Sequence, residues 1–365
     1  MQIVETNVWE VVSEAAGRRS NRYRAPAVQR RVIVRVQDED GNEGWGESVP
    51  LEYFTGETAS VSAAVLREAM KRLKGRCFED PLAVIDELAD FSQQHAARAG
   101  LEVALLDLRG KVSGVPLAHF LGGERRTEIS LYGGLGLLPP QEAVRRAQKC
   151  LDQGVSTFKI KVGVDLPADA ERVLAIREAF QDKVDIRTDA NGGYSPEEAL
   201  RFCEKIQDAR IEHFEQPVRP DEKSIFEVFR SIRGMGVPVA VDESLSSEEN
   251  ARQLIEEDAV DVGVIKIIKF GGPTSARKVC DLFEAAGKVP VVSSPYESFI
   301  GQAAGLALAL TLENGDKAHE FSDPEKGFAE WRHQHIGGRF IREEGAGIGA
   351  WGIIERLEAL AQSSV

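Results

Sequence analysis

Between residues 159 and 266, short apolar runs alternate with amphipathic segments, and each apolar run ends in a cluster of polar residues. The clusters are Lys159-Ile160-Lys161, Asp189-Ala190-Asn191, Glu215-Gln216-Pro217, Asp242-Glu243-Ser244 and Lys266. Alternation of this kind predicts successive strand–helix units in a parallel sheet. In a sheet that closes into a barrel, the carboxyl ends of the strands are where catalytic groups lie.

The same alternation continues on both sides and predicts a modified (β/α) barrel of the TIM type over residues 126–321. The expected strands are 129–133, 158–162, 185–189, 211–215, 237–241, 262–266, 289–293 and 318–321. Helices between them are expected to begin at Pro139-Pro140, at Ser195 and at Ser246-Ser247. Proline in a first turn, or serine followed by acidic residues, is typical of a helix start.

Residues 1–125 lack repeated strand–helix units and predict a separate α+β domain. Its expected elements are a strand at 31–36, a turn at 38–42, a strand resuming at 44–47, a loop at 50–56 and helices from 58 to about 111. The barrel pattern is lost after about residue 322. Residues 322–365 are therefore expected to fold back and complete the N-terminal domain.

Composition limits the classes of partner. A net charge of −14 argues against a nucleic-acid binder and against docking on anionic membranes. No apolar run is long enough to span a bilayer, and the first residues lack the pattern of a signal peptide. The four cysteines have no paired spacing, so reduced thiols in a cytoplasmic protein are expected. An anionic small molecule is still compatible with this charge, because lysines and a metal can make a positive pocket.

Three carboxylates, Asp189, Glu215 and Asp242, end three consecutive expected strands. Closure of the barrel would make them neighbours on one rim. Three oxygen ligands that leave positions for water and substrate suit octahedral Mg²⁺ better than Zn²⁺, which prefers nitrogen and sulfur. The alternative is that each acid caps a helix or lies at the surface. That alternative weakens when three acids recur at successive strand ends.

Lysines occupy positions where parallel strands are normally apolar. Lys159 and Lys161 are two residues apart, so they point to the same side of their strand. Two neighbouring ammonium groups lower each other's proton affinity, so Lys159 is expected to make Lys161 a usable base near neutral pH. Lys266 ends a strand across the barrel, which would place one lysine on each face of a metal-held substrate. Lys269 is assigned to the following loop.

These residues and their spacing resemble the enolase superfamily and, within it, the muconate-lactonizing-enzyme subgroup. Lys159-Ile160-Lys161 resembles the Lys-x-Lys signature of that subgroup, and the three carboxylates resemble its metal ligands. Four other segments resemble further motifs of the subgroup: Gly44–Glu47, Lys266 with Gly271-Gly272, Glu297–Gly301 and Gly345–Gly349. The histidine–aspartate dyad of the mandelate racemase subgroup is not visible after the sixth strand.

The resemblance implies a barrel capped by a domain built from both chain ends. It also implies a Mg²⁺ enzyme that abstracts the proton α to a carboxylate and stabilises the resulting enediolate. Lys161 and Lys266 would be the catalytic bases, with Lys159 beside them. A racemase or epimerase of an amino-acid derivative is favoured, because inversion requires a base on each face. The alternatives are a syn-dehydratase of the o-succinylbenzoate synthase type and a lactone-forming cycloisomerase.

Substrate contacts are expected from the strand ends and from the loop at 50–56, which should close over the barrel mouth near the metal. The eighth strand carries Glu320-Phe321-Ser322, followed by Asp323, where dipeptide epimerases usually have Asp-x-Asp. The expected substrate-binding residues are Asn191, Glu297, Glu320, Tyr53 and Phe54. The expected partner is a small-molecule carboxylate, and the chain is expected to form a homo-oligomer.

Two other classes compete with this interpretation. A barrel aldolase would use Lys161 or Lys266 to form a Schiff base. That class accounts for a lysine but not for three carboxylates at adjacent strand ends. A non-catalytic barrel that only binds a metal or a partner has no need of lysines on both faces. His213 lies two residues before Glu215 and should face the same way, next to the proposed metal ligand.

Overall fold

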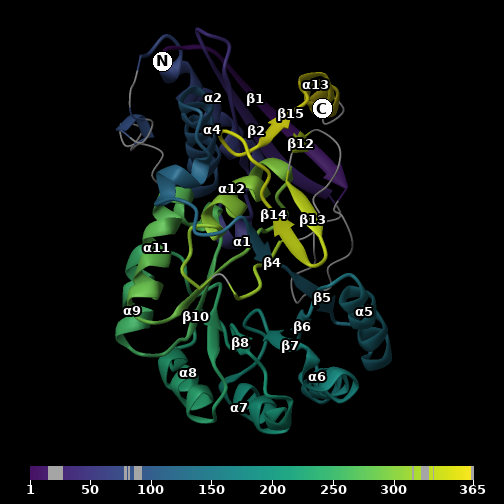
Figure 1. The fold of residues 1–365 in the computed structure, drawn as a ribbon. Coiled ribbons are helices and arrows are strands. Elements are labelled where there is room, and N and C mark those ends of the chain that lie inside the picture. The colour runs from purple at the N-terminus through teal and green to yellow at the C-terminus, as the bar shows by residue number, and fades with distance from the viewer. Residues whose placement is uncertain are drawn as a thin grey trace.

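The computed structural model describes residues 1–14, 28–77, 80, 83–85, 93–314, 316–321, 329–331 and 333–362. The chain forms two adjoining parts, an antiparallel sheet with helices at one end and a ring of strands and helices at the other (Figure 1). Both chain ends lie in the first part. This arrangement confirms the predicted fold class, a modified (β/α) barrel with an α+β capping domain.

The N-terminal sheet has the strand order β1-β2-β3 and is antiparallel throughout. Its strands are β1 (Ile3–Glu14), β2 (Val28–Asp38) and β3 (Glu43–Ser48), and α2 (Ala59–Leu73) and α4 (His95–Ser113) pack on them. The predicted turn forms after β2. The segment at 50–56, predicted as a loop, instead contains the one-turn helix α1 (Glu52–Thr55). This helix ends at Gly56, whose φ of 70° favours glycine.

Strand β3 lies very close to the backbone of α4. A Cβ atom on Gly46 would come within 1.9 Å of the carbonyl oxygen of Gly100, and one on Gly44 within 2.0 Å of that of Ala104. Only glycine permits this approach. Trp45, between the two glycines, is completely buried. The Gly44–Glu47 motif therefore sets the distance between the N-terminal sheet and α4.

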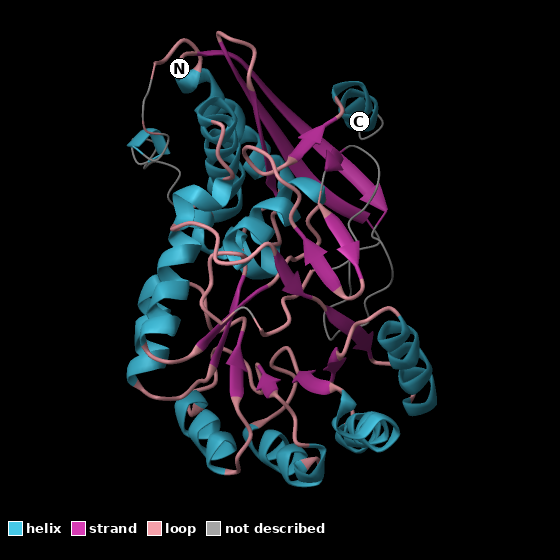
Figure 2. Ribbon diagram, viewed as in Figure 1, coloured by secondary structure: helices cyan, strands magenta, loops and turns pink. Residues whose placement is uncertain are grey.

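The second part is a parallel sheet with the strand order β11-β10-β9-β8-β7-β6-β5, and helices cover its outer face (Figure 2). The strands are β5 (Tyr132–Gly136), β6 (Thr157–Lys161), β7 (Asp185–Asp189), β8 (His213–Glu215), β9 (Val239–Val241), β10 (Val262–Ile265) and β11 (Val289–Val292). The longer helices are α5 (Pro140–Asp152), α6 (Leu166–Phe180), α7 (Pro196–Lys205), α8 (Ile225–Gly234), α9 (Glu248–Glu256), α11 (Pro273–Ala285) and α12 (Phe299–Ala309). The short helices are η2 (Leu117–Leu121), η3 (Gln181–Lys183), η4 (Gln207–Ala209) and α10 (Ile267–Phe270).

The predicted helix starts are present. Ser195 and Glu198 form a capping box at the start of α7, in which each side chain accepts the backbone N–H of the other residue. Ser247 caps α9 by accepting the N–H of Asn250 at 3.0 Å. The first helical residue of α5 is Pro140.

The first and last predicted barrel strands differ from the structure. The predicted strand 129–133 is divided, because β4 (Glu128–Ser130) pairs with the C-terminal tail while β5 joins the barrel. The predicted strand 318–321 forms isolated bridges, which pair Leu131 with His319 and Ser293 with Glu320. These bridges close the ring between β11 and β5, so the eighth position of the barrel is occupied without a regular strand.

The C-terminal tail returns to the N-terminal sheet. Its elements are β12 (Ala329–Trp331), β13 (Gln334–Ile336), β14 (Arg339–Ile341), β15 (Ala350–Gly352) and α13 (Ile354–Gln362). Helix α13 packs against β1, and β15 contacts β3. The predicted tail begins at residue 322, and its first residues, Asp323 among them, lie outside the described residues.

Two predictions from composition can be compared with the structure. All four cysteines, Cys77, Cys150, Cys203 and Cys280, have free thiols. Within the residues that the structure covers, no helix combines the length and the apolar content needed to cross a membrane.

Candidate active site

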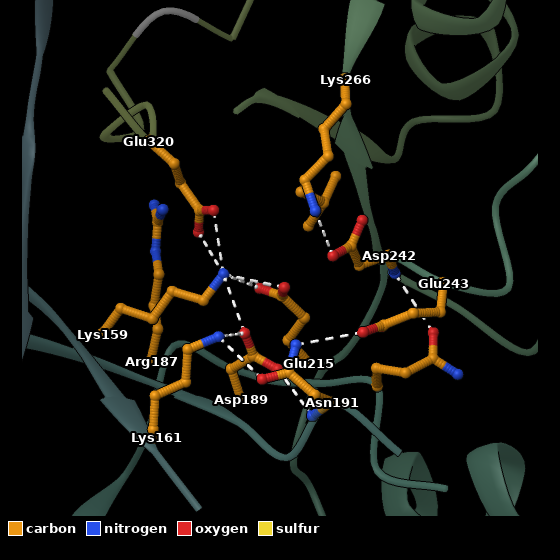
Figure 3. A network of polar contacts seen from close by, with 12 residues as sticks. Lys159, Lys161, Arg187, Asp189, Asn191, Glu215, Asp242, Glu243, Lys266 and Glu320 are labelled. Atoms are coloured by element: carbon orange, nitrogen blue, oxygen red, sulfur yellow. Dashed lines mark hydrogen bonds and ion pairs between the residues drawn. The ribbon is translucent and has the colours of Figure 1, made fainter. Parts of the chain in front are cut away.

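The barrel register brings the predicted residues together. Lys161 of β6, Asp189 of β7 and Glu215 of β8 are direct neighbours across three adjacent strands. Glu215 pairs with Ala240 of β9, so Asp242, two residues further on, points to the same side of the sheet. The three carboxylates are at most 2% exposed. Figure 3 shows their side chains converging at the carboxyl end of the strands.

Lys159 lies in the middle of this cluster. Its Nζ is 2.6 Å from Oε2 of Glu215, 2.9 Å from both carboxylate oxygens of Glu320 and 3.2 Å from Oδ2 of Asp189. Burial lowers the pKa of Lys159, but the carboxylates of Glu215 and Glu320 outweigh burial and raise it well above its ordinary value. Lys159 is therefore held as a cation that binds the acidic side chains in place.

Lys161 is more exposed than Lys159 and is held by two neighbours. Its Nζ contacts Oδ2 of Asp189 and donates to Oδ1 of Asn191 at 2.9 Å. The amide of Asn191 in turn donates to Oε1 of Glu243 at 3.1 Å. Asn191 has a φ of 45°, a left-handed conformation that asparagine tolerates. Asn191 thus orients Lys161, and its predicted contact with substrate stays a prediction.

Lys266 follows β10 on the far side of the carboxylates. Its Nζ contacts Oδ2 of Asp242 and lies 4.1 Å from the centroid of the Phe54 ring, which α1 brings from the N-terminal domain. Burial lowers the pKa of Lys266, but Asp242 and Glu243 outweigh it and raise the pKa above its ordinary value. The segment at 50–56, which was predicted to approach the site, therefore does so, and the ring of Phe54 contacts the predicted catalytic Lys266. Tyr53 lies on the same helix turn.

Lys269 is a site residue that the sequence did not identify. It is buried, and its Nζ donates to the backbone oxygen and Oδ1 of Asp242 at 2.7 and 3.0 Å and to the carbonyl oxygen of Val264 at 3.2 Å. Burial lowers the pKa of Lys269, and the charge of Lys266 lowers it further. The turn of α10 carries Lys269 back toward the strand ends, so it lies in the site and not in an open loop.

The pKa values of the acidic residues show how closely their carboxylates are packed. Burial raises the pKa of Asp189, but the ammonium group of Lys161 outweighs it and holds the pKa below its ordinary value. Burial and the charge of Asp189 raise the pKa of Glu215 well above its ordinary value. Burial and the charge of Asp242 raise the pKa of Glu243 to about 7. A further positive charge at this place would relieve the repulsion between the carboxylates.

The donor set fits Mg²⁺. Asp189, Glu215 and Asp242 offer only carboxylate oxygens, which are the ligands that hard divalent cations prefer. Among the described residues, no three acidic, histidine or cysteine side chains already surround one point as a metal would require. The ammonium group of Lys159 lies between Asp189 and Glu215 instead, and that of Lys266 contacts Asp242. Binding of a cation would therefore require side-chain shifts within a cluster whose chemistry already suits it.

A second layer of charged residues lies beneath the site. Lys159, Arg187 and His213 are neighbours across β6, β7 and β8, two residues before the site layer, and the side chain of Lys159 reaches from this layer into the site. Arg187 is 1% exposed; its Nε donates to Oε2 of Glu212 at 2.6 Å and its Nη1 to the carbonyl oxygen of Ala318 at 2.8 Å. Burial and the charge of Arg187 lower the pKa of His213 to about 3. His213 therefore lies in this layer as a neutral imidazole.

Glu297 lies next to the joint between the two domains. It precedes α12, where Glu47 of β3 accepts the N–H groups of Ser298 and Gly301 at 3.0 and 2.9 Å. Burial raises the pKa of Glu297 to about 8, so its carboxyl group is mainly neutral at pH 7. Arg31 forms an ion pair with Glu47 at 3.3 Å. The role of Glu297 in binding substrate stays a prediction. The role of Glu47, which binds the start of α12 from the N-terminal domain, was not predicted from the sequence.

Comparisons with known proteins agree with this geometry. Residues 20–122 match the family model described as the mandelate racemase / muconate lactonizing enzyme N-terminal domain, and residues 142–350 match the one described as enolase C-terminal domain-like. The L-Ala-D/L-Glu epimerase of Bacillus subtilis (strain 168) is 32% identical over 288 residues, which cover 78% of each chain. Muconate cycloisomerase 1 of Pseudomonas putida is 30% identical over 290 residues, covering 77% of this chain and 76% of that protein.

A solved structure is similar over nearly the whole chain. It is the dipeptide epimerase from Cytophaga hutchinsonii in complex with Mg and the dipeptide D-Ala-L-Val. The TM-score is 0.90 at 26% sequence identity, and the match covers 98% of both chains. With isomerases as its relatives, the chain is an enzyme of the enolase superfamily and belongs to the muconate-lactonizing-enzyme subgroup of that superfamily.

Proposed function

We propose that the enzyme is a Mg²⁺-dependent racemase or epimerase of an amino-acid derivative. It would remove the proton α to a carboxylate on one face of the substrate and return a proton on the other face. The family membership supports proton abstraction next to a carboxylate. The epimerases among the relatives support inversion as the overall reaction.

The observation that carries the proposal is the position of two lysines at opposite ends of the carboxylate row. Lys161 contacts Asp189 at one end, Lys266 contacts Asp242 at the other, and Glu215 lies between them (Figure 3). A small substrate bound at this row would have one ammonium-bearing side chain on each side. Inversion through a planar intermediate requires such an arrangement, because the proton must leave one face and arrive at the other.

Asp189, Glu215 and Asp242 would hold the Mg²⁺ ion. When bound, the ion would supply positive charge next to the substrate carboxylate, where negative charge develops as the α-proton leaves. Lys159 fixes the carboxylate of Glu215 through its contact at 2.6 Å. Asn191 and Phe54 orient the two bases.

We further propose that the substrate is an amino acid whose nitrogen carries an acyl group without an ammonium group, unlike a dipeptide. Both oxygens of Glu320 accept hydrogen bonds from Lys159 at 2.9 Å, so Glu320 already has a cationic partner within the protein. A substrate with a free ammonium group would have to compete with Lys159 for this carboxylate. An amide nitrogen carries no charge and has no such requirement.

The test is incorporation of deuterium at the α-carbon, followed by NMR in D₂O with Mg²⁺. The probes are both enantiomers of N-succinyl amino acids and the dipeptides L-Ala-L-Glu and L-Ala-D-Glu. We expect wild-type protein to exchange both stereoisomers of an N-succinyl probe. Lys161→Ala and Lys266→Ala should each abolish net inversion, and each should still exchange one stereoisomer. Lys288→Ala, which removes a lysine bonded to Asp258 and Val260, is the matched control and should leave exchange unchanged.

The runner-up is a syn-dehydratase, in which Lys266 would act through its charge alone. The contact between Lys266 and the Phe54 ring favours this candidate, because a lysine held over an aromatic face is placed to stabilise charge. In that case deuterium exchange would depend on one and the same lysine, and the two variants would not each retain exchange of a different stereoisomer. Full turnover by both variants would rule out both candidates.

A further inference from the structure

Helix α4 of the N-terminal domain lies along the segment that follows Lys266. The carboxylate of Glu102 accepts the backbone N–H of Thr274 at 2.7 Å, at the start of α11. Glu102 is 1% exposed. Figure 1 shows α4 and α11 adjoining on one side of the molecule, and α4 contacts both α10 and α11. A buried side chain of one domain thus binds the first turn of a barrel helix.

The turn between Lys266 and α11 is fitted tightly against α4. Gly271 and Gly272 have φ values of 76° and 144°, in the region that favours glycine. A Cβ atom on Gly272 would come within 2.1 Å of Oε2 of Glu102, and one on Gly271 within 3.1 Å of Cδ of Arg98. Arg98 and Glu102 are four residues apart, so they lie on the same face of α4. This face therefore defines the path of the chain through the Gly271-Gly272 turn.

Little chain separates this contact from the predicted base. Strand β10 ends at Ile265, Lys266 follows directly, and the single turn of α10 leads to the two glycines and α11. Helix α11 has no capping side chain of its own, because the residue before it is Gly272. Glu102 provides a negatively charged acceptor at this helix start, where anions are stabilised.

We propose that Glu102 is a positioning residue for Lys266. By holding the start of α11, the carboxylate of Glu102 fixes the segment that carries Lys266, and so it couples docking of the N-terminal domain to assembly of the active site. Glu102 accepts the backbone N–H of Thr274, so its effect on Lys266 passes along the backbone of this segment. The functional arm of this inference rests on the proposed function, whereas the structural arm does not.

The structural arm measures how readily Lys266 reacts in the full-length protein. Glu102→Gln keeps the shape and an acceptor oxygen but removes the charge. The matched control is Asp107→Asn. Asp107 is a buried residue of the same helix, and its carboxylate accepts the backbone N–H groups of Trp45 and Ile348, outside the segment that carries Lys266. Each protein is treated with N-acetoxysuccinimide without substrate, and acetylation of each lysine is followed by peptide mass spectrometry. Lys288 serves as the internal reference.

We expect Lys266 to be acetylated about tenfold faster in Glu102→Gln than in wild type, since a hydrogen bond to a charged group is worth roughly this factor or more. Lys288 should react equally in all proteins, and Asp107→Asn should leave Lys266 at the wild-type rate. Glu102→Asp, which keeps the charge on a shorter side chain, should lie between wild type and Glu102→Gln. If Lys266 reacts equally in Glu102→Gln and Asp107→Asn, Glu102 has only a general structural role and the inference is wrong.

The functional arm uses the deuterium exchange assay with N-succinyl amino acids. Glu102→Gln should slow exchange of the stereoisomer that depends on Lys266 more than exchange of the one that depends on Lys161. Equal slowing of both would contradict the inference. If wild-type protein exchanges neither stereoisomer, the proposed function fails on its own, and the acetylation rates still decide the role of Glu102.

Discussion

The aromatic ring of Phe54 covers the ammonium group of Lys266, with 4.1 Å between Nζ and the ring centroid. The two residues come from different domains, Phe54 from the helix turn α1 and Lys266 from the end of β10. Lys266 is 7% exposed, so the contact is largely removed from water. A cation–π contact that is desolvated in this way contributes about 1–2 kcal/mol. It therefore links the position of α1 to that of a predicted base.

Phe54→Leu should reduce kcat/KM for the accepted N-succinyl amino acid by about tenfold, the kinetic equivalent of such a contact. The matched control is Phe120→Leu, because the Phe120 ring lies 5.2 Å from the guanidinium of Arg109, away from the site. The control should retain the kcat/KM of wild type. Equal values for both variants would show that the ring over Lys266 contributes nothing to turnover.

Glu297 should make the stability of the protein depend on pH. Burial raises its pKa from 4.5 to about 8, so above the ordinary pKa the unfolded chain loses this proton while the folded protein keeps it. The free energy of unfolding should therefore fall as pH rises from about 4.5 to about 8, by up to about 1.4 kcal/mol per pH unit from this group. In Glu297→Gln this fall should be smaller. Urea denaturation across this pH range measures it, with the exposed Glu204→Gln as control, and parallel curves for both variants would contradict the prediction.

The strands and most site residues could be predicted because their signals are local. An apolar run followed by Asp189, Glu215 or Asp242 is visible within a few residues. Because the strands are parallel, their carboxyl ends lie on one edge of the sheet. The two-residue spacing of Lys159 and Lys161 likewise fixes their common direction. The sequence therefore predicts the three carboxylates and the lysines at positions 159, 161 and 266 without knowledge of the register.

Contacts between distant parts of the chain could not be predicted in this way. Glu102 and Thr274 are 172 residues apart, and Glu47 and Ser298 are 251 apart, so nothing local marks these glutamates as caps for barrel helices. Lys269 was missed because the single turn of α10 has no periodic signal of its own. The eighth strand was predicted as regular because its apolar pattern gives no sign that its pairing is reduced to isolated bridges.

Asp242→Asn should weaken Mg²⁺ binding by about a hundredfold, because it removes one of the three proposed carboxylate ligands. Even changes outside the ligand set of a metal cost about 10–100-fold. Isothermal titration calorimetry with MgCl₂ measures the affinity. Asp261→Asn is the control, since Asp261 precedes the other end of β10 and binds Arg233. An unchanged affinity in Asp242→Asn would remove the proposed metal site.

Arg187 should contribute strongly to stability through the layer beneath the site. Its guanidinium joins β7 to the eighth segment by donating to the carbonyl oxygen of Ala318, and it pairs with Glu212 at 2.6 Å. Arg187→Met keeps a side chain of similar length, but it leaves both the Glu212 carboxylate and the carbonyl oxygen of Ala318 with one partner fewer. Removing one member of a buried ion pair costs about 3–5 kcal/mol. The control is Lys317→Met, which removes the other partner of Glu212 from a side chain that is 47% exposed.

Urea denaturation should show a loss of about 3–5 kcal/mol for Arg187→Met and at most about 1 kcal/mol for Lys317→Met, because exposed ion pairs contribute little. The acid dependence should change as well. Burial raises the pKa of Glu212, but Arg187 outweighs burial and lowers it to about 2, so this stability is present above about pH 4.5 and is lost as pH falls toward 2. In Arg187→Met the acid loss should be shallower. If the two variants lose equal stability, Arg187 does not hold the eighth segment, and the isolated bridges alone must close the barrel.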